Sequence, residues 1–321
     1  MPKVFVTRQI PDAGIKLLRE KGFEVDVYEQ DQVIPRDVFL QRVKGVDAIL
    51  SLLTDKMDAE LMDAAGPQLK VIAQFAVGFD NINLADAAAR NVIITNTPGV
   101  LTESVAECAI ALLFAISRRL VEADQFLRDG KFNGWAPMMY LGNDLTGKTL
   151  GLVGLGRIGE AVAKRMSDGF DMKVIYYDIK RSEEFEQKYK IEYRELGDLL
   201  KESDYISIHV PMNEKTRHLI GAEQLKMMKK TAYLVNTARG PVVDEAALVE
   251  ALKAGEIKGA ALDVYEAEPK TAPGLTELPN TVLLPHIASA TEETRGAMGE
   301  LAAKNIIEVL EGRAPLTQVK Q

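Results

Sequence analysis

Residues 150–159 read Leu-Gly-Leu-Val-Gly-Leu-Gly-Arg-Ile-Gly, a short apolar strand pattern that runs directly into a glycine-rich turn. The glycines of this turn, Gly154, Gly156 and Gly159, open a helical pattern. Asp178 ends the next predicted strand, 19 residues after Gly159. A strand, a G-x-G-x-x-G turn, a helix and an acid at this distance are together typical of a Rossmann unit that binds a dinucleotide.

Each residue of this motif has a physical task. Gly154 permits the tight turn, Gly156 lets backbone N–H groups approach a pyrophosphate, and Gly159 lets the helix pack on the strand. The phosphate charge is stabilised at the N-terminal end of the helix. Asp178 can accept hydrogen bonds from a ribose diol. A glycine-rich turn followed by a solvated aspartate is the alternative, and the strand and helix on either side disfavour it.

Short β-branched runs alternate with helical patterns on both sides of the motif. Before it, strands are predicted at 4–7, 24–27, 48–52, 71–74 and 92–96, with helices at 11–21, 36–43, 58–64 and 84–90. From the motif onward, strands are predicted at 150–153, 173–177, 205–209, 232–236, 259–262 and 281–284. This alternation implies parallel sheets that helices cover on both faces.

The chain is therefore predicted to be an α/β protein with two doubly wound domains and a cleft between them. Residues 1–98, completed by 290–321, form a flavodoxin-like substrate domain, and 99–289 form a Rossmann NAD(P)-binding domain. A long helix is predicted at about 102–128. An irregular stretch at 130–143 follows and contains the only tryptophan, Trp135.

The bulk composition excludes several classes of protein. A net charge of −8 gives a nucleic acid no electrostatic attraction. The single cysteine, Cys108, excludes an intrachain disulfide and fits a reducing compartment. The amino terminus has a strand pattern, and the apolar runs are shorter than a membrane span. We predict a cytoplasmic protein without a membrane or nucleic-acid partner. No cluster has metal-ligand spacing, so we predict no metal.

Polar residues follow three successive predicted strands. Arg239 follows 232–236, Asp263 follows 259–262, and His286 follows 281–284. Because ligands bind at the carboxyl ends of the strands in open α/β sheets, these loops suggest one shared cleft. Of the three histidines, His286 has the best position for acid–base chemistry. A structural role remains the alternative for it.

Six stretches of the chain, in the expected order, resemble the D-isomer-specific 2-hydroxyacid dehydrogenase family. They are residues 77–82, 147–159, 209–211, 236–240, 262–269 and 285–291. Within the family, residues 135–137 and 142–148 are most similar to glyoxylate/hydroxypyruvate reductases. One departure is Ala288, where the family often has glycine. A methyl group there narrows the nicotinamide side of the cleft.

This resemblance implies the roles of individual residues. It makes Arg239, Glu268 and His286 the catalytic set. It assigns the substrate carboxylate to Arg239 and to main-chain N–H groups near Val77 and Gly78. The cofactor contacts that we expect, including the motif glycines, are Thr102, Gly154, Gly156, Arg157, Ile158, Gly159, Asp178, His209, Val210, Pro211, Thr216, Thr237, Ala238, Asp263 and Ala288.

The implied reaction is the NAD(P)H-dependent reduction of a small 2-oxo acid, glyoxylate or hydroxypyruvate, to the 2-hydroxy acid. The nicotinamide gives a hydride to the keto carbon, His286 gives a proton to the oxygen, and Arg239 grips the carboxylate. Glu268 hydrogen-bonds His286 and favours its charged form. The family also leads us to expect a homodimer, formed through the long helix and residues 130–143; Trp135 as a local core anchor is the alternative.

Two questions stay open at this level. Asp178 repels the 2′-phosphate of NADP(H), so NAD(H) is the expected cofactor, but Lys180 and Arg181 follow closely and could bind that phosphate. The alternative functions are phosphoglycerate dehydrogenase, another D-2-hydroxyacid dehydrogenase, and a non-enzymatic NAD-sensing module like the family's corepressors. The complete catalytic set argues against the last of these.

Overall fold

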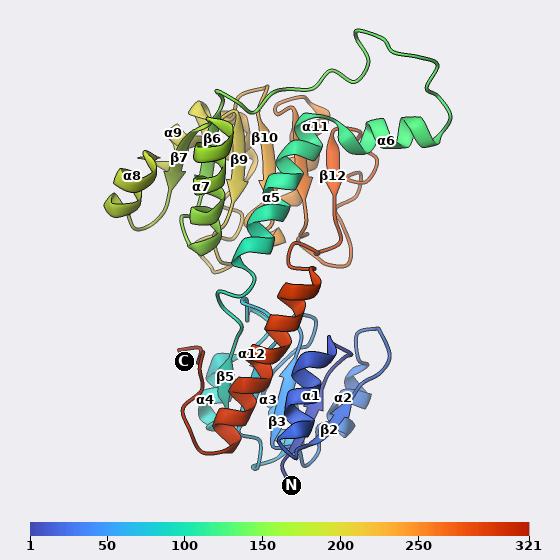
Figure 1. The fold of residues 1–321 in the computed structure, drawn as a ribbon, viewed down its shortest axis with the longest axis vertical. Coiled ribbons are helices and arrows are strands. Elements are labelled where there is room, and N and C mark those ends of the chain that lie inside the picture. Colours follow the sequence, from blue (N-terminus) through green and yellow to red (C-terminus); the bar gives the residue numbers. More distant parts are fainter. Residues whose placement is uncertain (321) are drawn as a thin grey trace. The chain divides into compact units, whose positions relative to one another are not determined.

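The computed structural model describes residues 1–320, which form two compact units. Unit 1 consists of Met1–Leu101 together with the chain from Ser289 onward, and unit 2 consists of Thr102–Ala288. Each unit is built on one parallel sheet with helices packed against it, which confirms the predicted α/β class (Figure 1).

Unit 1 has a five-stranded parallel sheet in the order β2-β1-β3-β4-β5. This is the flavodoxin-like strand order. Its strands are β1 (Lys3–Val6), β2 (Glu24–Val27), β3 (Ala48–Ser51), β4 (Val71–Gln74) and β5 (Ile93–Thr95). Its helices are α1 (Asp12–Glu20), α2 (Arg36–Arg42), α3 (Ala59–Ala65), α4 (Leu84–Ala89) and α12 (Glu292–Leu310).

Helix α12, at the end of the chain, belongs to unit 1 because it packs closely on α1. A Cβ atom at Gly14 would lie only 2.4 Å from the carbonyl oxygen of Gly299, so glycine is needed at this crossing. The buried side chain of Asn305 donates to Thr317 Oγ1 over 2.7 Å, and the Thr317 hydroxyl donates to the carbonyl of Asn96 over 2.6 Å. These bonds fix the carboxyl-terminal segment beside β5.

Unit 2 has a seven-stranded parallel sheet in the order β12-β11-β10-β9-β6-β7-β8. The direction of strand addition reverses between β6 and β9, and such a switch point is where Rossmann units bind their ligands. The strands are β6 (Thr149–Val153), β7 (Lys173–Tyr177), β8 (Glu192–Tyr193), β9 (Tyr205–Ile208), β10 (Tyr233–Asn236), β11 (Gly259–Leu262) and β12 (Thr281–Leu283).

The helices of unit 2 cover both faces of its sheet. They are α5 (Thr102–Ser117), α6 (Leu120–Arg128), α7 (Arg157–Phe170), α8 (Glu183–Tyr189), α9 (Leu196–Glu202), α10 (Ala222–Met227) and α11 (Glu245–Lys253), with a 3-10 turn at Gly240–Val242. One buried apolar cluster joins α5 and α7 to the sheet, and a second joins α9, α10 and α11 to the opposite face. Strands buried on both faces read as continuous apolar runs, as in LGLV before the glycine turn.

The prediction of one helix over about 102–128 was wrong. The structure has two helices, α5 and α6, separated at Arg119, which has φ +54°. The cause is a contact from later in the chain: the N–H of Asn143 donates to the carbonyl of Ser117 over 2.8 Å. A Cβ atom at Gly142 would lie 2.4 Å from that same oxygen. The chain that returns after Trp135 therefore takes the carbonyl at which α5 ends.

Residues 1–320 contain neither a membrane-spanning helix nor a cluster of metal-binding side chains. None of the helices there combines the length and the apolar character that crossing a membrane requires. The same residues contain no group of three or more His, Cys, Asp or Glu side chains placed to hold a metal ion.

Candidate active site and cofactor site

The glycine turn lies between β6 and α7 at the switch point of the sheet. Gly154 has φ +102°, and a Cβ atom there would come within 2.9 Å of the backbone of His209 and Val210. A Cβ atom at Gly159 would lie 2.3 Å from the carbonyl oxygen of Gly154. Gly156, the N-cap of α7, faces open space instead. The turn therefore has the room that a bound pyrophosphate needs in front of the helix N-terminus.

Asp178 follows β7 and is bonded to the glycine turn. Its carboxylate accepts the N–H of Leu155 over 2.7 Å and the N–H of Lys180 over 3.2 Å. The half-buried side chain is thereby held at the end of the second strand of the Rossmann unit. A carboxylate in this position suits a ribose diol, because each oxygen retains a further acceptor site.

Arg181, which follows Asp178 closely in the sequence, is bound to Glu186. Arg181 donates from Nε and Nη2 to the two oxygens of Glu186, over 2.8 and 2.7 Å. The hydroxyl of the fully buried Tyr176 donates to Glu186 over 2.8 Å. The Arg181 hydrogen bond is the main cause that lowers the pKa of Glu186. Glu186 is not among the site residues predicted from the sequence.

His209 lies directly behind the glycine turn. Its Nε2 lies 2.9 Å from the hydroxyl of Ser207, and burial lowers the pKa of His209 to about 4. The ring is therefore neutral at physiological pH. The backbone of His209 packs against Gly154. Farther along this loop, the Thr216 hydroxyl donates to the carbonyl of Pro211 over 2.7 Å, which closes the turn.

Arg239, Glu268 and His286 come from loops that follow β10, β11 and β12, three adjacent strands of the sheet. His286 Nδ1 lies 2.9 Å from Glu268 Oε2, and the N–H of Tyr265 donates to Glu268 Oε1 over 3.1 Å. Burial alone would raise the pKa of Glu268. The bond to His286, its charge, the Tyr265 amide and the charge of Arg239 outweigh burial and lower that pKa.

Asp263 holds the backbone of the His286 loop. Its carboxylate accepts the N–H groups of Ile287 and Ala288 over 2.7 and 2.8 Å, and its carbonyl accepts the N–H of His286 over 2.9 Å. His286 has φ +57°, a conformation that costs a non-glycine residue roughly 1–2 kcal/mol. Burial raises the pKa of Asp263, against the opposing effect of the two amide bonds. Three hydrogen bonds to Asp263 thus fix the backbone of residues 286–288.

Arg239 is held through its main chain. The side chain of Asn236 donates to the Arg239 carbonyl over 2.9 Å and accepts the Ala238 N–H over 3.0 Å. Arg239 Nη1 donates to the Ala238 carbonyl over 2.7 Å. A Cβ atom at Gly240 would lie 1.9 Å from the carbonyl carbon of Tyr265, so the Arg239 loop touches the Glu268 loop. The hydroxyl of Thr237 is buried without a hydrogen-bond partner among the described residues.

The remaining predicted residues have these positions. Arg157 and Ile158 form the first turn of α7, Thr102 begins α5, and Ala288 is buried. Val77 and Gly78 follow β4 in unit 1, where their carbonyls accept the side chains of Asn96 and Gln74 over 2.8 and 3.3 Å. Within unit 2 the predicted site residues therefore fall into two groups, one on the loops around His286 and one on the loops around Gly156.

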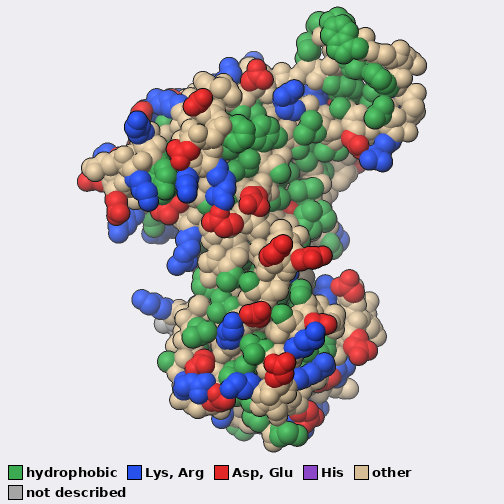
Figure 2. All heavy atoms as spheres, viewed as in Figure 1, with side chains coloured by type: hydrophobic (Ala, Val, Ile, Leu, Met, Phe, Trp, Pro, Cys, Tyr) green, Lys and Arg blue, Asp and Glu red, His purple; other side chains and the backbone are tan. Residues whose placement is uncertain are grey.

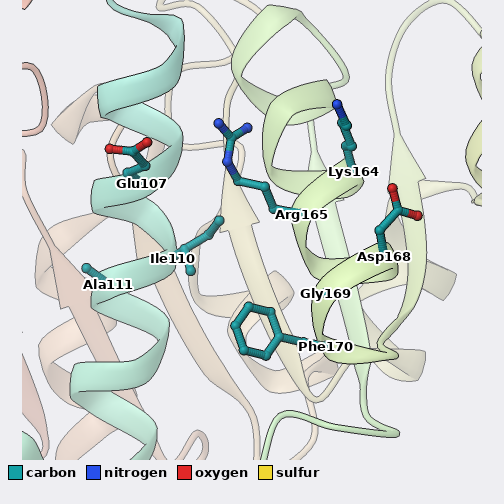
Figure 3. A pocket seen from close by; sticks show the side chains of 8 residues that line it. All are labelled: Glu107, Ile110, Ala111, Lys164, Arg165, Asp168, Gly169 and Phe170. Atoms are coloured by element: carbon teal, nitrogen blue, oxygen red, sulfur yellow. The ribbon is translucent and has the colours of Figure 1, made fainter.

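One groove of unit 2 coincides with neither group. It has a volume of about 610 Å³ and lies between α5 and the carboxyl-terminal half of α7. Figure 3 shows Ile110 and Phe170 in the space between these helices, with charged side chains beside them. None of its lining residues is a predicted site residue, and the chemistry of unit 2 is carried by its strand-end loops instead.

Residues 110–288 match the family model described as D-isomer specific 2-hydroxyacid dehydrogenase, NAD binding domain. A glyoxylate reductase of Thermococcus litoralis is 52% identical over 98% of this chain and 95% of its own. The chain belongs to the D-isomer specific 2-hydroxyacid dehydrogenase family. The motif resemblance seen in the sequence is thereby confirmed.

Two solved structures of related proteins resemble this dehydrogenase throughout. The TT0316 protein from Thermus thermophilus is 44% identical, with a TM-score of 0.93 over 99% of this chain and 100% of that one. The NADPH-dependent glyoxylate/hydroxypyruvate reductase from Sinorhizobium meliloti, in complex with NADP and malonate, is 36% identical, with a TM-score of 0.86 over 99% and 96%. These likenesses extend over both units of the dehydrogenase.

Proposed function

We propose that this dehydrogenase reduces glyoxylate, and the related hydroxypyruvate, to the corresponding 2-hydroxy acids. The observation that carries the proposal is the pair formed by His286 and Glu268 beside Arg239, on three adjacent strand-end loops. The glyoxylate reductase relatives favour this substrate class. These relatives favour a glyoxylate reductase over a phosphoglycerate dehydrogenase and over a non-enzymatic NAD-sensing module.

His286 is the proposed proton donor. In its imidazolium form it gives a proton from Nε2 to the substrate oxygen, because Nδ1 faces Glu268. The lowered pKa of Glu268 keeps its carboxylate ionised, so it stabilises the charged imidazole. When bound, the nicotinamide supplies the hydride that the keto carbon accepts.

Arg239 is the proposed anchor for the substrate carboxylate. Its planar guanidinium can bind a carboxylate through two parallel hydrogen bonds. Its positive charge would also polarise the keto group. The N–H groups near Val77 and Gly78 are assigned to the same carboxylate on the family resemblance.

NAD(H) is the proposed cofactor, held by the glycine turn, by Asp178 and by the loops at Thr216, Thr237 and Asp263. Asp178 would repel a 2′-phosphate, whereas Arg181 could attract one. The pairing of Arg181 with Glu186 supports the preference for NAD(H), since the Glu186 carboxylate already balances the positive charge of the guanidinium. NADP(H) remains the alternative, and the Sinorhizobium meliloti relative was solved with NADP.

A homodimer is also proposed, formed through α6, the second part of the predicted long helix, and the segment 130–143, which we name the arm. Trp135 in the arm is 82% exposed, so it is no core anchor within its own chain. Other large hydrophobic side chains exposed there are Leu120, Val121, Leu127, Phe132, Met138 and Leu141. Figure 2 shows hydrophobic side chains gathered over this part of the surface. A patch of this kind favours burial against a second copy of the chain.

The decisive experiment is a panel of initial rates. Glyoxylate, hydroxypyruvate, pyruvate and phosphohydroxypyruvate are each offered with NADH and with NADPH. We expect the highest kcat/KM for glyoxylate or hydroxypyruvate. A preference for phosphohydroxypyruvate, or binding of NADH without turnover of any acid, would overturn the proposal. The cytoplasmic location remains a prediction from the sequence.

A further inference from the structure

Glu245, the first residue of α11, is a buried carboxylate outside the catalytic set. Only 4% of the surface of Glu245 is exposed to solvent. Glu245 Oε2 accepts the N–H of Glu266 over 2.7 Å, and Oε1 accepts the N–H of Ala272 over 2.6 Å. These two amides lie before and after Glu268 in the loop that follows β11. One carboxylate therefore ties together both sides of the segment that carries Glu268.

The bonds to Glu245 are costly to lose. Hydrogen bonds from backbone N–H groups to an ionised carboxylate are stronger than those between neutral groups. Without the carboxylate, the N–H groups of Glu266 and Ala272, both in half-buried residues, would lose their hydrogen-bond partner, and N–H groups that are shielded from water without a partner destabilise the loop. Glu245 also lies in the first turn of α11, where acidic residues are favoured. The capping bond of this helix is supplied separately, by Asp244 to the N–H of Ala247 over 2.9 Å.

The connection from Glu245 to the imidazole is short. Glu245 holds the N–H of Glu266, the neighbouring Tyr265 N–H donates to Glu268, and Glu268 bonds His286. The Tyr265 hydroxyl donates to the carbonyl of Leu284 over 2.8 Å, two residues before His286. A displacement of residues 265–272 would therefore move the Glu268 carboxylate away from His286.

We propose that Glu245 is a positioning residue for the proton-transfer pair. It sets the distance between Glu268 and His286 by fixing the loop backbone on both sides of Glu268. The proposal rests on the proposed function, because it concerns the same proton transfer. A residue that only stabilised the fold would leave the rate and pH dependence of the folded enzyme unchanged.

The test is a double-mutant cycle on the full-length protein. Glu245→Gln keeps the shape of the side chain but replaces one acceptor oxygen with an NH₂ group that faces an N–H. A displacement near 1 Å lowers kcat by up to about 10²-fold. The pH profile should shift in the same direction as that of Glu268→Gln. The double variant should be no slower than Glu268→Gln alone, because Glu245 acts through Glu268.

The control is Glu250→Gln on the same helix. The exposed side chain of Glu250 bonds Lys253 and lies outside the Glu268 loop, so this change of equal charge should leave kcat and the pH profile unaltered. Glu245→Asp, which keeps the charge but shortens the reach, replaces Glu245→Gln if that variant does not fold. Thermal unfolding and NADH binding are measured for every variant.

The outcomes separate cleanly. A lower melting temperature with wild-type kcat and pH profile would overturn the positioning role, and so would losses in the double variant that multiply. A wild-type protein that turns over none of the four acids would refute the proposed function instead. A wild-type protein that turns over, with Glu245→Gln impaired only in the presence of Glu268, supports both.

Discussion

The Nδ1 atom of His286 lies 2.9 Å from Oε2 of Glu268. This contact leaves Nε2 as the only ring nitrogen that can face a substrate. The other oxygen of Glu268 accepts the Tyr265 N–H, so the carboxylate cannot rotate without losing a bond. The orientation of the imidazole is thus set by its neighbours before any ligand arrives.

Removing either member of the pair should lower kcat. His286→Ala removes the general acid, which typically costs roughly 10²–10⁴-fold in rate, while NADH binding stays nearly intact. Glu268→Gln keeps the shape but removes the negative charge that stabilises the imidazolium. Reduction by Glu268→Gln should therefore fall off at a lower pH on the alkaline side. Steady-state rates across the pH range measure this, and a profile that overlays the wild type would contradict the pairing.

The same pair also predicts how the free energy of unfolding depends on pH on the acid side. The lowered pKa of Glu268 means that the folded protein holds this carboxylate ionised below its ordinary value of 4.5. The contribution of Glu268 to the folding stability is therefore fully present above pH 4.5. It is lost as the pH falls through the lower pKa of the folded state. Glu268→Gln removes this acid-side dependence.

Arg239→Lys should raise KM for glyoxylate and lower kcat. Lysine keeps the charge but cannot offer the two parallel N–H groups that match a carboxylate. The Arg239 backbone is held by Asn236, so the loop conformation should survive the change. The affinity for NADH, measured by calorimetry, serves as the control. Wild-type steady-state constants for this variant would rule out the carboxylate assignment.

Much of the fold was predictable because its signals are local. The alternation of strands and helices, the glycine turn and Asp178 all depend on neighbours within about 30 residues. The strands were predicted within about one residue at most ends, although the two-residue strand β8 was missed.

The features that sequence reasoning missed depend on distant contacts. The break at Arg119 is set by Gly142 and Asn143, and nothing within residues 102–128 indicates it. Glu245 reads as an ordinary acid at a helix start, and only the structure shows the loop amides that it accepts. Glu186 likewise follows Glu183 and Glu184 in an acidic run, and the pairing with Arg181 distinguishes it.

Trp135→Asp should convert the proposed dimer into a monomer. A charge placed in the arm would be buried without a partner on assembly, while the fold of the single chain is little affected because Trp135 is exposed. Sedimentation equilibrium of both proteins gives the masses. Leu316→Asp, at an exposed apolar residue of unit 1, is the matched control and should keep the wild-type mass. A wild-type protein that is already monomeric would contradict the proposed assembly.

Asp58→Asn should remove a pH-dependent part of the stability of unit 1. Burial opposes ionisation of Asp58, but Lys56, Arg36 and the Leu61 N–H lower its pKa to about 2, from 3.8. This difference corresponds to at most about 2.5 kcal/mol of stability at neutral pH, which solvent screening of the ion pairs reduces. Asparagine can still cap α3, so the capping bond is retained.

The sign of that effect is fixed by the lowered pKa. The stability difference between wild type and Asp58→Asn should be complete above about pH 4 and should shrink as the pH falls towards about 2. Urea unfolding followed by circular dichroism measures it at several pH values. Asp63→Asn, whose more exposed carboxylate pairs with Arg90, should change stability by clearly less. A constant difference at every pH would refute the assignment to Asp58.

Cofactor preference should depend on Asp178 and Glu186 together. Asp178→Ser removes the charge that repels a 2′-phosphate, and Glu186→Gln weakens the two bonds that hold Arg181. We expect kcat/KM of the wild type to be higher with NADH than with NADPH. Asp178→Ser should reduce this ratio, and the double variant should reduce it further. Glu184→Gln, an exposed acid on the same helix, should leave the preference unaltered. Initial rates at saturating glyoxylate and dissociation constants for both nucleotides measure the preference. A wild type that favours NADPH would show that the basic residues outweigh Asp178.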